Sequence, residues 1–153
     1  MTAATFLIDN SALVRILRLP ARAHWESPLT EGVIARCPVT EIEFLYSAGN
    51  TEEREQLVED LDELFGRAPL DDRALTRAWT VQKELTAKGR HRSAGAVDLL
   101  IAATAELQGL TVLHYDNDFE AIASVTGQPT QWLAPRAVCD RLSPDRPVGV
   151  LPL

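Results

Sequence analysis

Four aspartates occupy positions where a carboxylate needs a physical explanation. Asp98 lies inside the apolar run Ala-Val-Asp-Leu-Leu-Ile-Ala-Ala, where an unpaired ionised carboxylate costs several kcal/mol. Asp9 and Asp116 each follow the last apolar residues of a predicted strand, and Asp118 comes two residues after Asp116. Because ligands bind at the carboxyl ends of parallel strands, we expect Asp9, Asp98 and Asp116 to lie close together. Three negative charges in a small space repel one another unless a divalent cation binds among them.

Each aspartate also has a purely structural interpretation. Asp98 stands near the N-terminus of a predicted helix, where the helix dipole favours a negative charge. Asp9 and Asp116 suit turns or helix caps, and Asp118 suits the N-cap of the helix that follows it. The case for chemistry therefore depends on the aspartates being gathered in one place.

A fifth acid is expected from the segment Val-Thr-Glu-Ile-Glu, which contains Glu41 and Glu43. Glu43 is the candidate for the acidic set, and Glu41 competes with it for the same role. Thr40 and Glu43 also fit a capping box, which would explain the glutamate without any chemistry.

Oxygen donors of this kind suit Mg²⁺ or Mn²⁺ rather than zinc, which prefers clusters of histidine and cysteine. Hydrolysis of phosphodiester bonds is the usual work of such a carboxylate-held metal site, because the ion activates water and stabilises the leaving oxygen. The chain has no GxSxG, Walker-type or GxGxxG motif, and its three histidines are isolated. A phosphatase or phosphotransfer domain is the competing enzyme class, but a DxDxT-like nucleophile motif is missing.

Strands alternate with helices along the chain, which predicts an α/β domain with a mainly parallel central sheet flanked by helices. Strands are expected at 5–8, 33–36 and 111–115, with an edge strand at 130–133. Helices are expected from 11 to 17, 22 to 30, 38 to 48, 51 to 65, 71 to 88, 96 to 107 and 118 to 125. A domain is expected over residues 1–138, followed by an extended, proline-rich tail over 139–153.

The amphipathic helices predict which side chains face the core. In the helix that begins at Asp71 or Asp72, we expect Leu75, Ala78, Trp79 and Leu85 to point inward. The helix over 96–107 is apolar almost all round and should be central and buried.

The net charge of −7 argues against a general nucleic-acid binder, which needs a basic footprint. One local basic segment stands out, and it comprises Lys83, Lys88, Arg90, His91 and Arg92. It is either a solvated helix end or a phosphate-binding rim beside the acidic pocket. The two cysteines lie far apart and predict free thiols, hence a cytoplasmic protein, and no signal peptide or membrane span is expected.

With these acids placed, the sequence resembles the PIN-domain family and, within it, the VapC toxins. The matching segments come in family order along the chain: Phe-Leu-Ile-Asp9-Asn-Ser-Ala-Leu, Val-Thr-Glu-Ile-Glu43-Phe-Leu-Tyr-Ser, Gly-Ala-Val-Asp98-Leu-Leu-Ile-Ala-Ala and Val-Leu-His-Tyr-Asp116-Asn-Asp118-Phe. Each segment alone is a weak signal, but four in this order and spacing are specific.

The resemblance implies a ribonuclease that uses Mg²⁺ or Mn²⁺ and is the toxin of a VapBC toxin–antitoxin pair. It implies that Asp9, Asp98 and Asp116 are metal ligands, that Glu43 completes the catalytic acids and that Asp118 is an auxiliary member.

The resemblance also assigns binding roles. Ser11 would steady the first aspartate or the metal beside the RNA. The basic segment, rather than the resemblance, predicts that Arg92 and Arg90 contact the RNA, and Arg92 is favoured because it is the closest to Asp98 in sequence. The implied partners are RNA, a VapB-type antitoxin and a second copy of the chain. The alternative is a PIN-fold binding module that has lost its activity.

Overall fold

A computed structural model describes residues 3–135 of the chain as one α/β unit built on a five-stranded sheet. The strands are β1 (Phe6–Ile8), β2 (Ile34–Arg36), β3 (Gly66–Arg67), β4 (Thr111–His114) and β5 (Thr130–Trp132). The helices are α1 (Asn10–Ile16), α2 (Leu19–Glu31), α3 (Pro38–Leu45), α4 (Thr51–Leu64), α5 (Asp72–Ala87), α6 (Ala96–Gln108) and α7 (Asp118–Thr126), with a 3₁₀ turn, η1, at His91–Ser93.

The sheet has the strand order β3-β2-β1-β4-β5, and every neighbouring pair is parallel. β1 lies at the centre, with Ile8 opposite Leu113 of β4. This register places the residues that follow β1 and β4 side by side at one edge of the sheet. The predicted parallel α/β architecture is confirmed.

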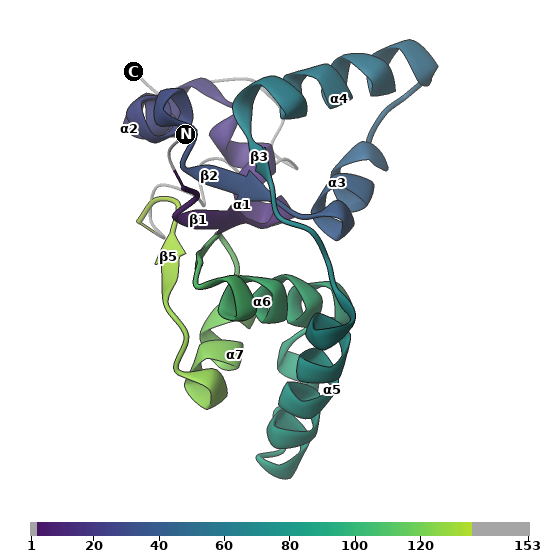
Figure 1. Ribbon diagram of the computed structural model, residues 1–153, viewed down its shortest axis with the longest axis vertical. Coiled ribbons are helices and arrows are strands. Elements are labelled where there is room, and N and C mark those ends of the chain that lie inside the picture. The colour runs from purple at the N-terminus through teal and green to yellow at the C-terminus, as the bar shows by residue number, and fades with distance from the viewer. Residues whose placement is uncertain (1–2, 136–153) are drawn as a thin grey trace, which may run out of the picture.

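Helices cover both faces of the sheet, as Figure 1 shows. Alternate residues of each strand point to opposite faces, so the strands feed two separate cores. Leu7, Ala35 and Val112 pack in the core that also holds α5, α6 and α7. Ile8, Ile34 and Leu113 pack in the core with α1 and α2. Because both faces are buried, the strands are continuous apolar runs rather than alternating ones.

The helix α6 is central, as predicted, and six of its residues are buried. Its buried side chains are mainly small, which allows α5 and α7 to approach it closely. Gly109 ends the helix with a φ of 67°, in the left-handed region that favours glycine.

Several predicted boundaries need correction. The strand β3 was not predicted, because its two residues are too few to show any periodicity. The helix α2 begins at Leu19, since Pro20 suits the first turn of a helix. The helix α3 ends at Leu45 rather than near residue 48, and the N-cap of α1 is Asp9 rather than Asn10 or Ser11.

The inward face predicted for α5 is partly wrong. Leu75 and Trp79 are 51% and 66% exposed, although both were expected in the core. The buried residues of the helix are Ala74, Ala78, Val81 and Leu85. The small side chains of Ala74 and Ala78 let α5 pack closely against its neighbours, so the large apolar side chains are turned outward.

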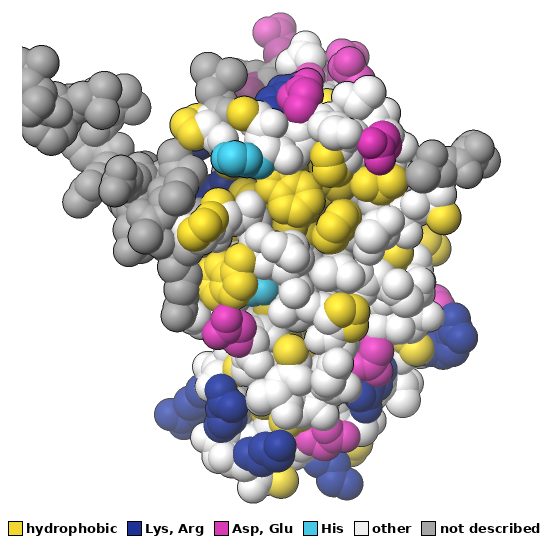
Figure 2. Space-filling model, turned by 90° about the vertical axis from the view of Figure 1, so that its left-hand side faces the viewer, with side chains coloured by type: hydrophobic (Ala, Val, Ile, Leu, Met, Phe, Trp, Pro, Cys, Tyr) yellow, Lys and Arg dark blue, Asp and Glu magenta, His cyan; other side chains and the backbone are white. Residues whose placement is uncertain are grey.

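Charge is unevenly distributed over the molecule. The helix α4 carries seven acidic residues and one arginine, so it accounts for six of the seven net negative charges of the chain. Figure 2 shows Lys and Arg side chains mainly toward the lower end of the molecule, the end to which α5 extends in Figure 1. The net charge of −7 therefore does not describe the surface as a whole.

No helix within residues 3–135 is long and apolar enough to cross a membrane. Cys37 is buried with a free thiol, whereas Cys139 and the predicted tail over 139–153 lie outside the described residues.

Candidate functional site

Asp9 follows β1 directly and is only 3% exposed. It is the N-cap of α1, where its carboxylate accepts hydrogen bonds from the backbone amides of Ser11 (3.1 Å) and Ala12 (3.2 Å). Burial raises the pKa of the Asp9 carboxyl to about 7, and the charge of Asp116 adds to this, although the hydrogen bonds from Ser11 and Ala12 oppose it. The capping role is therefore real, but it leaves a buried carboxyl that would gain from a nearby cation.

The hydroxyl of Ser11 joins the ends of β1 and β4. It donates to the Asp9 carboxylate, whose two oxygens lie 2.8 and 2.9 Å away, and it accepts from the backbone amide of Tyr115 at 2.8 Å. The amide can only donate, so the proton of the hydroxyl is directed at Asp9. This places Ser11 as a residue that orients Asp9, and its contact with RNA stays a prediction.

Asp98 occupies the first turn of α6, and its Oδ2 accepts a hydrogen bond from the Gly95 amide at 3.2 Å. The structural interpretation of Asp98 as a helix-capping residue is thus correct, but it is incomplete. The pKa of Asp98 is raised to about 7, chiefly by burial and also by the hydrogen bond and charge of Asp118 and the charge of Asp9, while the hydrogen bond from the Gly95 amide lowers it. Three aspartates from three parts of the chain therefore act on one another here.

Asp116 and Asp118 complete this group at the end of β4. Oδ1 of Asp116 accepts from the Asp118 amide at 3.1 Å, which forms a tight turn at the start of α7. Burial raises the pKa of the Asp118 carboxyl, and the charge of Asp116 raises it too, while the hydrogen bond with Asp98 lowers it. The structure thus brings Asp9, Asp98, Asp116 and Asp118 within electrostatic reach of one another, and we use the name aspartate cluster for these four residues.

His114 lies beneath the cluster and was not singled out from the sequence. Its side chain is fully buried against Phe119 and Trp132, and its Nδ1 accepts from the Asp116 amide at 3.2 Å. Burial lowers the pKa of His114 to about 4, so the ring is neutral near pH 7. It supports Asp116 by holding the backbone amide of that residue, and an isolated histidine in a strand gives no sequence signal for such a role.

Glu43 lies on α3 at the border of an apolar groove of about 370 Å³. The groove is lined by Val39, Ile42, Glu43, Tyr46 and Val97, and Val97 is the residue before Asp98. Glu43 is exposed as a whole, but partial burial of its carboxyl raises its pKa. The capping-box interpretation is wrong, because α3 begins at Pro38 and the side chain of Thr40 bonds to the Ile8 carbonyl instead.

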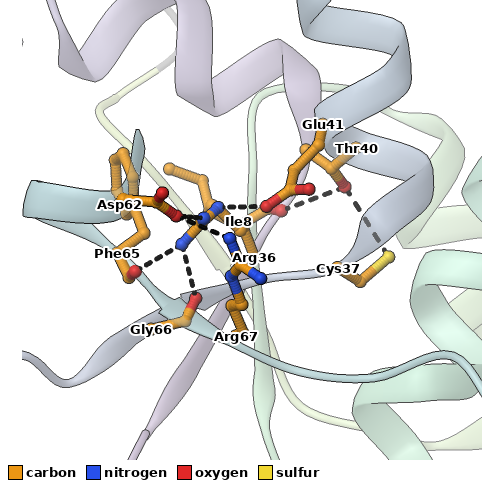
Figure 3. A network of polar contacts seen from close by, with 9 residues as sticks. All are labelled: Ile8, Arg36, Cys37, Thr40, Glu41, Asp62, Phe65, Gly66 and Arg67. Atoms are coloured by element: carbon orange, nitrogen blue, oxygen red, sulfur yellow. Dashed lines mark hydrogen bonds and ion pairs between the residues drawn. The ribbon is translucent and has the colours of Figure 1, made fainter. Parts of the chain in front are cut away.

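Glu41 does not line this groove and is bound by Arg36, a contact that Figure 3 shows. Arg36 is 2% exposed and forms ion pairs with Glu41 of α3 and Asp62 of α4. Its guanidinium also donates to the backbone carbonyls of Phe65 and Gly66. A buried guanidinium must be neutralised and fully hydrogen-bonded, so Glu41 is needed where it is. Glu41 thus has a structural partner, and of the two glutamates only Glu43 lines the groove, so the place of Glu43 in the acidic set stays a prediction.

The aspartate cluster fits a divalent cation by its chemistry. Its donors are all carboxylate oxygens, the type that Mg²⁺ and Mn²⁺ prefer. A cation bound among these carboxylates would also reduce their mutual repulsion. Within the described residues, however, no group of three or more acidic, histidine or cysteine side chains is arranged to hold a metal ion as it stands. Metal binding would have to draw the carboxylates closer together.

The predicted RNA-contacting arginines lie just before α6. Arg90 and Arg92 are both exposed, and Nη1 of Arg90 donates to the Ser124 hydroxyl of α7 at 3.2 Å. Arg92 belongs to η1, a few residues before Asp98.

Comparisons with known proteins agree with this geometry. The family model described as "PIN domain" matches residues 6–125. The chain is 43% identical to "Ribonuclease VapC21" of Mycobacterium tuberculosis (strain CDC 1551 / Oshkosh), an alignment that covers 84% of this chain and 93% of that protein. It is 40% identical to "Ribonuclease VapC18" of M. tuberculosis (strain ATCC 25618 / H37Rv), with 86% of this chain and 96% of that protein covered.

Solved structures show the same fold. A chain in the crystal structure of DNA-bound VapBC from Salmonella typhimurium superposes with a TM-score of 0.70 at 19% identity, covering 86% of this chain and 99% of that one. A chain of VapBC-5, a member of the VapBC family of toxin–antitoxin systems from M. tuberculosis, gives a TM-score of 0.56 at 25% identity, with 86% and 98% covered.

The raised pKa of Asp98 predicts how stability depends on pH when metal is removed. In the folded protein Asp98 titrates near 7, but in the unfolded chain near 3.8, so the folded state holds the proton between these values. Stability from this group is complete below about pH 4 and is lost as the pH rises through about 7. His114 acts in the opposite direction over part of this range, because its pKa is lowered. We therefore expect the stability of the wild type relative to the Asp98→Asn variant to fall from pH 5 to pH 8.

The measurement is urea unfolding of both proteins in EDTA across this range. Because both proteins contain His114, the difference between their profiles reports Asp98 together with the carboxyls of Asp118 and Asp9 that interact with it. Two parallel profiles would contradict the assignment of a raised pKa to this carboxyl.

Proposed function

Because this chain belongs to the PIN-domain family and, within it, to the VapC ribonucleases, we propose that it is an endoribonuclease toxin that depends on Mg²⁺ or Mn²⁺. The observation that carries the proposal is the aspartate cluster, in which Asp9 and Asp98 have pKa values raised to about 7. Carboxyls so gathered destabilise the fold when ionised, and this arrangement is typical of functional sites.

The cluster supports a specific division of labour. Asp9, Asp98 and Asp116 would hold the cation, which supplies an activated water and stabilises the charge that develops on the phosphate. Ser11 fixes the orientation of the Asp9 carboxylate through its bond to the Tyr115 amide. Asp118 shares a hydrogen bond with Asp98 and has a raised pKa, so it would be the carboxyl suited to proton transfer once Asp98 binds the cation. Glu43 adds a carboxylate from α3 at the border of the site.

The proposal is tested by incubating total RNA with purified protein in Mg²⁺, in Mn²⁺ and in EDTA. We expect cleavage with either metal, none in EDTA, and a loss of about a hundredfold or more in the Asp98→Asn variant, since losing a metal ligand should cost at least as much as losing a residue that orients one. Cleavage that survives EDTA and the variant would contradict the metal-site mechanism. Absence of cleavage by folded wild-type protein across RNA classes would favour an inactive PIN-fold binding module.

A matched pair of variants controls this experiment. Glu43→Gln should lose cleavage, whereas Glu41→Gln should keep the activity per folded molecule, because Glu41 binds Arg36. Loss of a charge beside the buried Arg36 should lower the stability of Glu41→Gln, so the folded fraction of both variants is measured alongside cleavage. The opposite result would transfer the role to Glu41.

Arg92 is proposed to contact the phosphates of bound RNA beside the cluster. It is exposed, and none of the described carboxylates lies within ion-pair distance of it, so its charge is available to a ligand. Arg92→Ala should weaken RNA cleavage and leave metal affinity unchanged. For a single-stranded substrate, the slope of log affinity against log salt should fall by about 0.7. Unchanged cleavage would reject this role.

The partner is proposed to be a VapB-type antitoxin, because structural neighbours of this chain are VapBC complexes. A second copy of the chain is also proposed as a partner, since Ile42 and Tyr46 beside the groove are 72% and 93% exposed. The tagged chain, co-expressed with the product of a neighbouring small gene, should co-purify with it and lose its ribonuclease activity. The mass of the free toxin in solution should be that of a dimer. Failure to co-purify, or a monomeric mass, would count against the corresponding partner.

A further inference from the structure

The outer side of α5 carries an aromatic ring that the fold does not use. Trp79 is 66% exposed, the largest apolar side chain so placed among the described residues. One helical turn further on, the Lys83 ammonium lies 6.0 Å from the centre of the indole ring. An exposed tryptophan with a cation beside it is a surface suited to a flat, negatively charged ligand.

The cations that follow Trp79 are not neutralised by the protein. Within the described part of the chain, five arginines form ion pairs with carboxylates, namely Arg22, Arg36, Arg67, Arg73 and Arg77. No such ion pair with a described carboxylate forms at four exposed cations, namely Lys83, Lys88, Arg90 and Arg92. Arg54 of α4 is also without such an ion pair, so what distinguishes these four cations is that they follow one another closely along the chain.

The sequence around these cations is also locally basic. From Trp79 to Gly95 the only acid is Glu84, which lies 3.9 Å from Arg77. The acids of the chain are instead concentrated on α4. A polyanion would therefore be attracted to the end of α5 and repelled from α4.

We propose that Trp79, Lys83 and Lys88, together named the α5 strip, bind single-stranded RNA that flanks the cleaved bond. The inference rests on the proposed ribonuclease function and extends its substrate site beyond Arg90 and Arg92. An unpaired base stacks on the indole of Trp79, while the two lysines bind phosphates of the same strand.

The geometry of the strip favours a single strand over other ligands. Trp79 and Lys83 share one face of α5. Lys88 is the C-cap residue, about 14 Å further along the axis and about half a turn round the helix from Trp79, so a strand that contacts both passes over the C-terminal end of α5. The chain then passes through η1 directly to α6, the helix of Asp98. A base paired within a duplex does not offer its face to an indole ring, so stacking on Trp79 selects unpaired RNA. A protein partner would bury Trp79 and Leu75 but has no need of unpaired cations.

The test is direct binding of a fluorescent single-stranded oligoribonucleotide to the full chain in EDTA, where no cleavage is expected. Trp79→Ala should weaken binding about tenfold, and Trp79→Phe should restore most of it. The double variant Lys83→Gln, Lys88→Gln should lower the salt slope by about 1.4, because each phosphate that a lysine neutralises contributes about 0.7. The same RNA sequence as a duplex should bind wild type and Trp79→Ala equally well.

Arg54→Gln is the matched control, because Arg54 is an exposed arginine on α4 with no ion pair to a described carboxylate. It should leave RNA binding unchanged. Thermal unfolding should be the same for all variants, since the altered side chains are exposed.

The outcomes separate the two proposals. If the wild type cleaves and binds RNA but the α5-strip variants bind RNA as well as Arg54→Gln does, the RNA-binding role of the α5 strip is wrong. The proposed ribonuclease function is then unaffected. If Trp79→Ala loses binding to a protein partner but keeps its RNA binding, the RNA-binding role of the α5 strip is also wrong. Wild-type protein that neither binds nor cleaves RNA overturns both.

Discussion

The aspartate cluster depends on the register between β1 and β4. The Ser11 side chain holds the ends of these two strands together. Ile8 lies opposite Leu113, so the residues that follow these two strands come together at one edge. The Ser11 hydroxyl then bonds to Asp9 on one side and to the Tyr115 amide on the other. Like charges would drive these chain segments apart, and this hydrogen-bonded bridge is part of what opposes the repulsion. The helix α6 packs near the same edge and adds Asp98, so the cluster draws its carboxylates from three segments of the chain.

A second constraint acts on the opposite side of the site. The buried guanidinium of Arg36 ties the first turn of α3 to the end of α4 and to β3. Glu41 and Glu43 are two residues apart and therefore point to different sides of the helix. Because Arg36 binds Glu41, the side of α3 that carries Glu41 faces Arg36. Glu43 lies on another side of the helix and lines the groove. The fold thus distinguishes two chemically identical side chains by supplying a partner to one of them.

Much of the fold could be read from the sequence because its signals are local. Apolar runs followed by acids marked β1 and β4, and the length of the apolar segment marked α6 as buried. The four aspartates of the site were found because each is costly or conspicuous where it stands. The strand β3 was missed because pairing with β2, not its own two residues, makes it a strand. The outward turn of Leu75 and Trp79 was missed because close packing through Ala74 and Ala78 overrides side-chain hydrophobicity. Arg36 was missed because Asp62, Phe65 and Gly66, which it binds, are distant in sequence. His114 was missed because a lone histidine in a strand carries no signal, although the Asp116 amide that it binds is only two residues away.

The two edge strands of the sheet are short, and this affects how the protein associates with other chains. Its border strands are β3, with two residues, and β5, with three. Such short edges offer few free backbone groups to an incoming strand, and β3 also carries the charged side chain of Arg67. The molecule is thus protected against edge-to-edge aggregation and against sheet extension by a passing peptide. Within residues 3–135, the helices therefore offer more surface for association than the sheet edges do, and recognition there depends on shape and charge rather than on the generic pattern of a backbone.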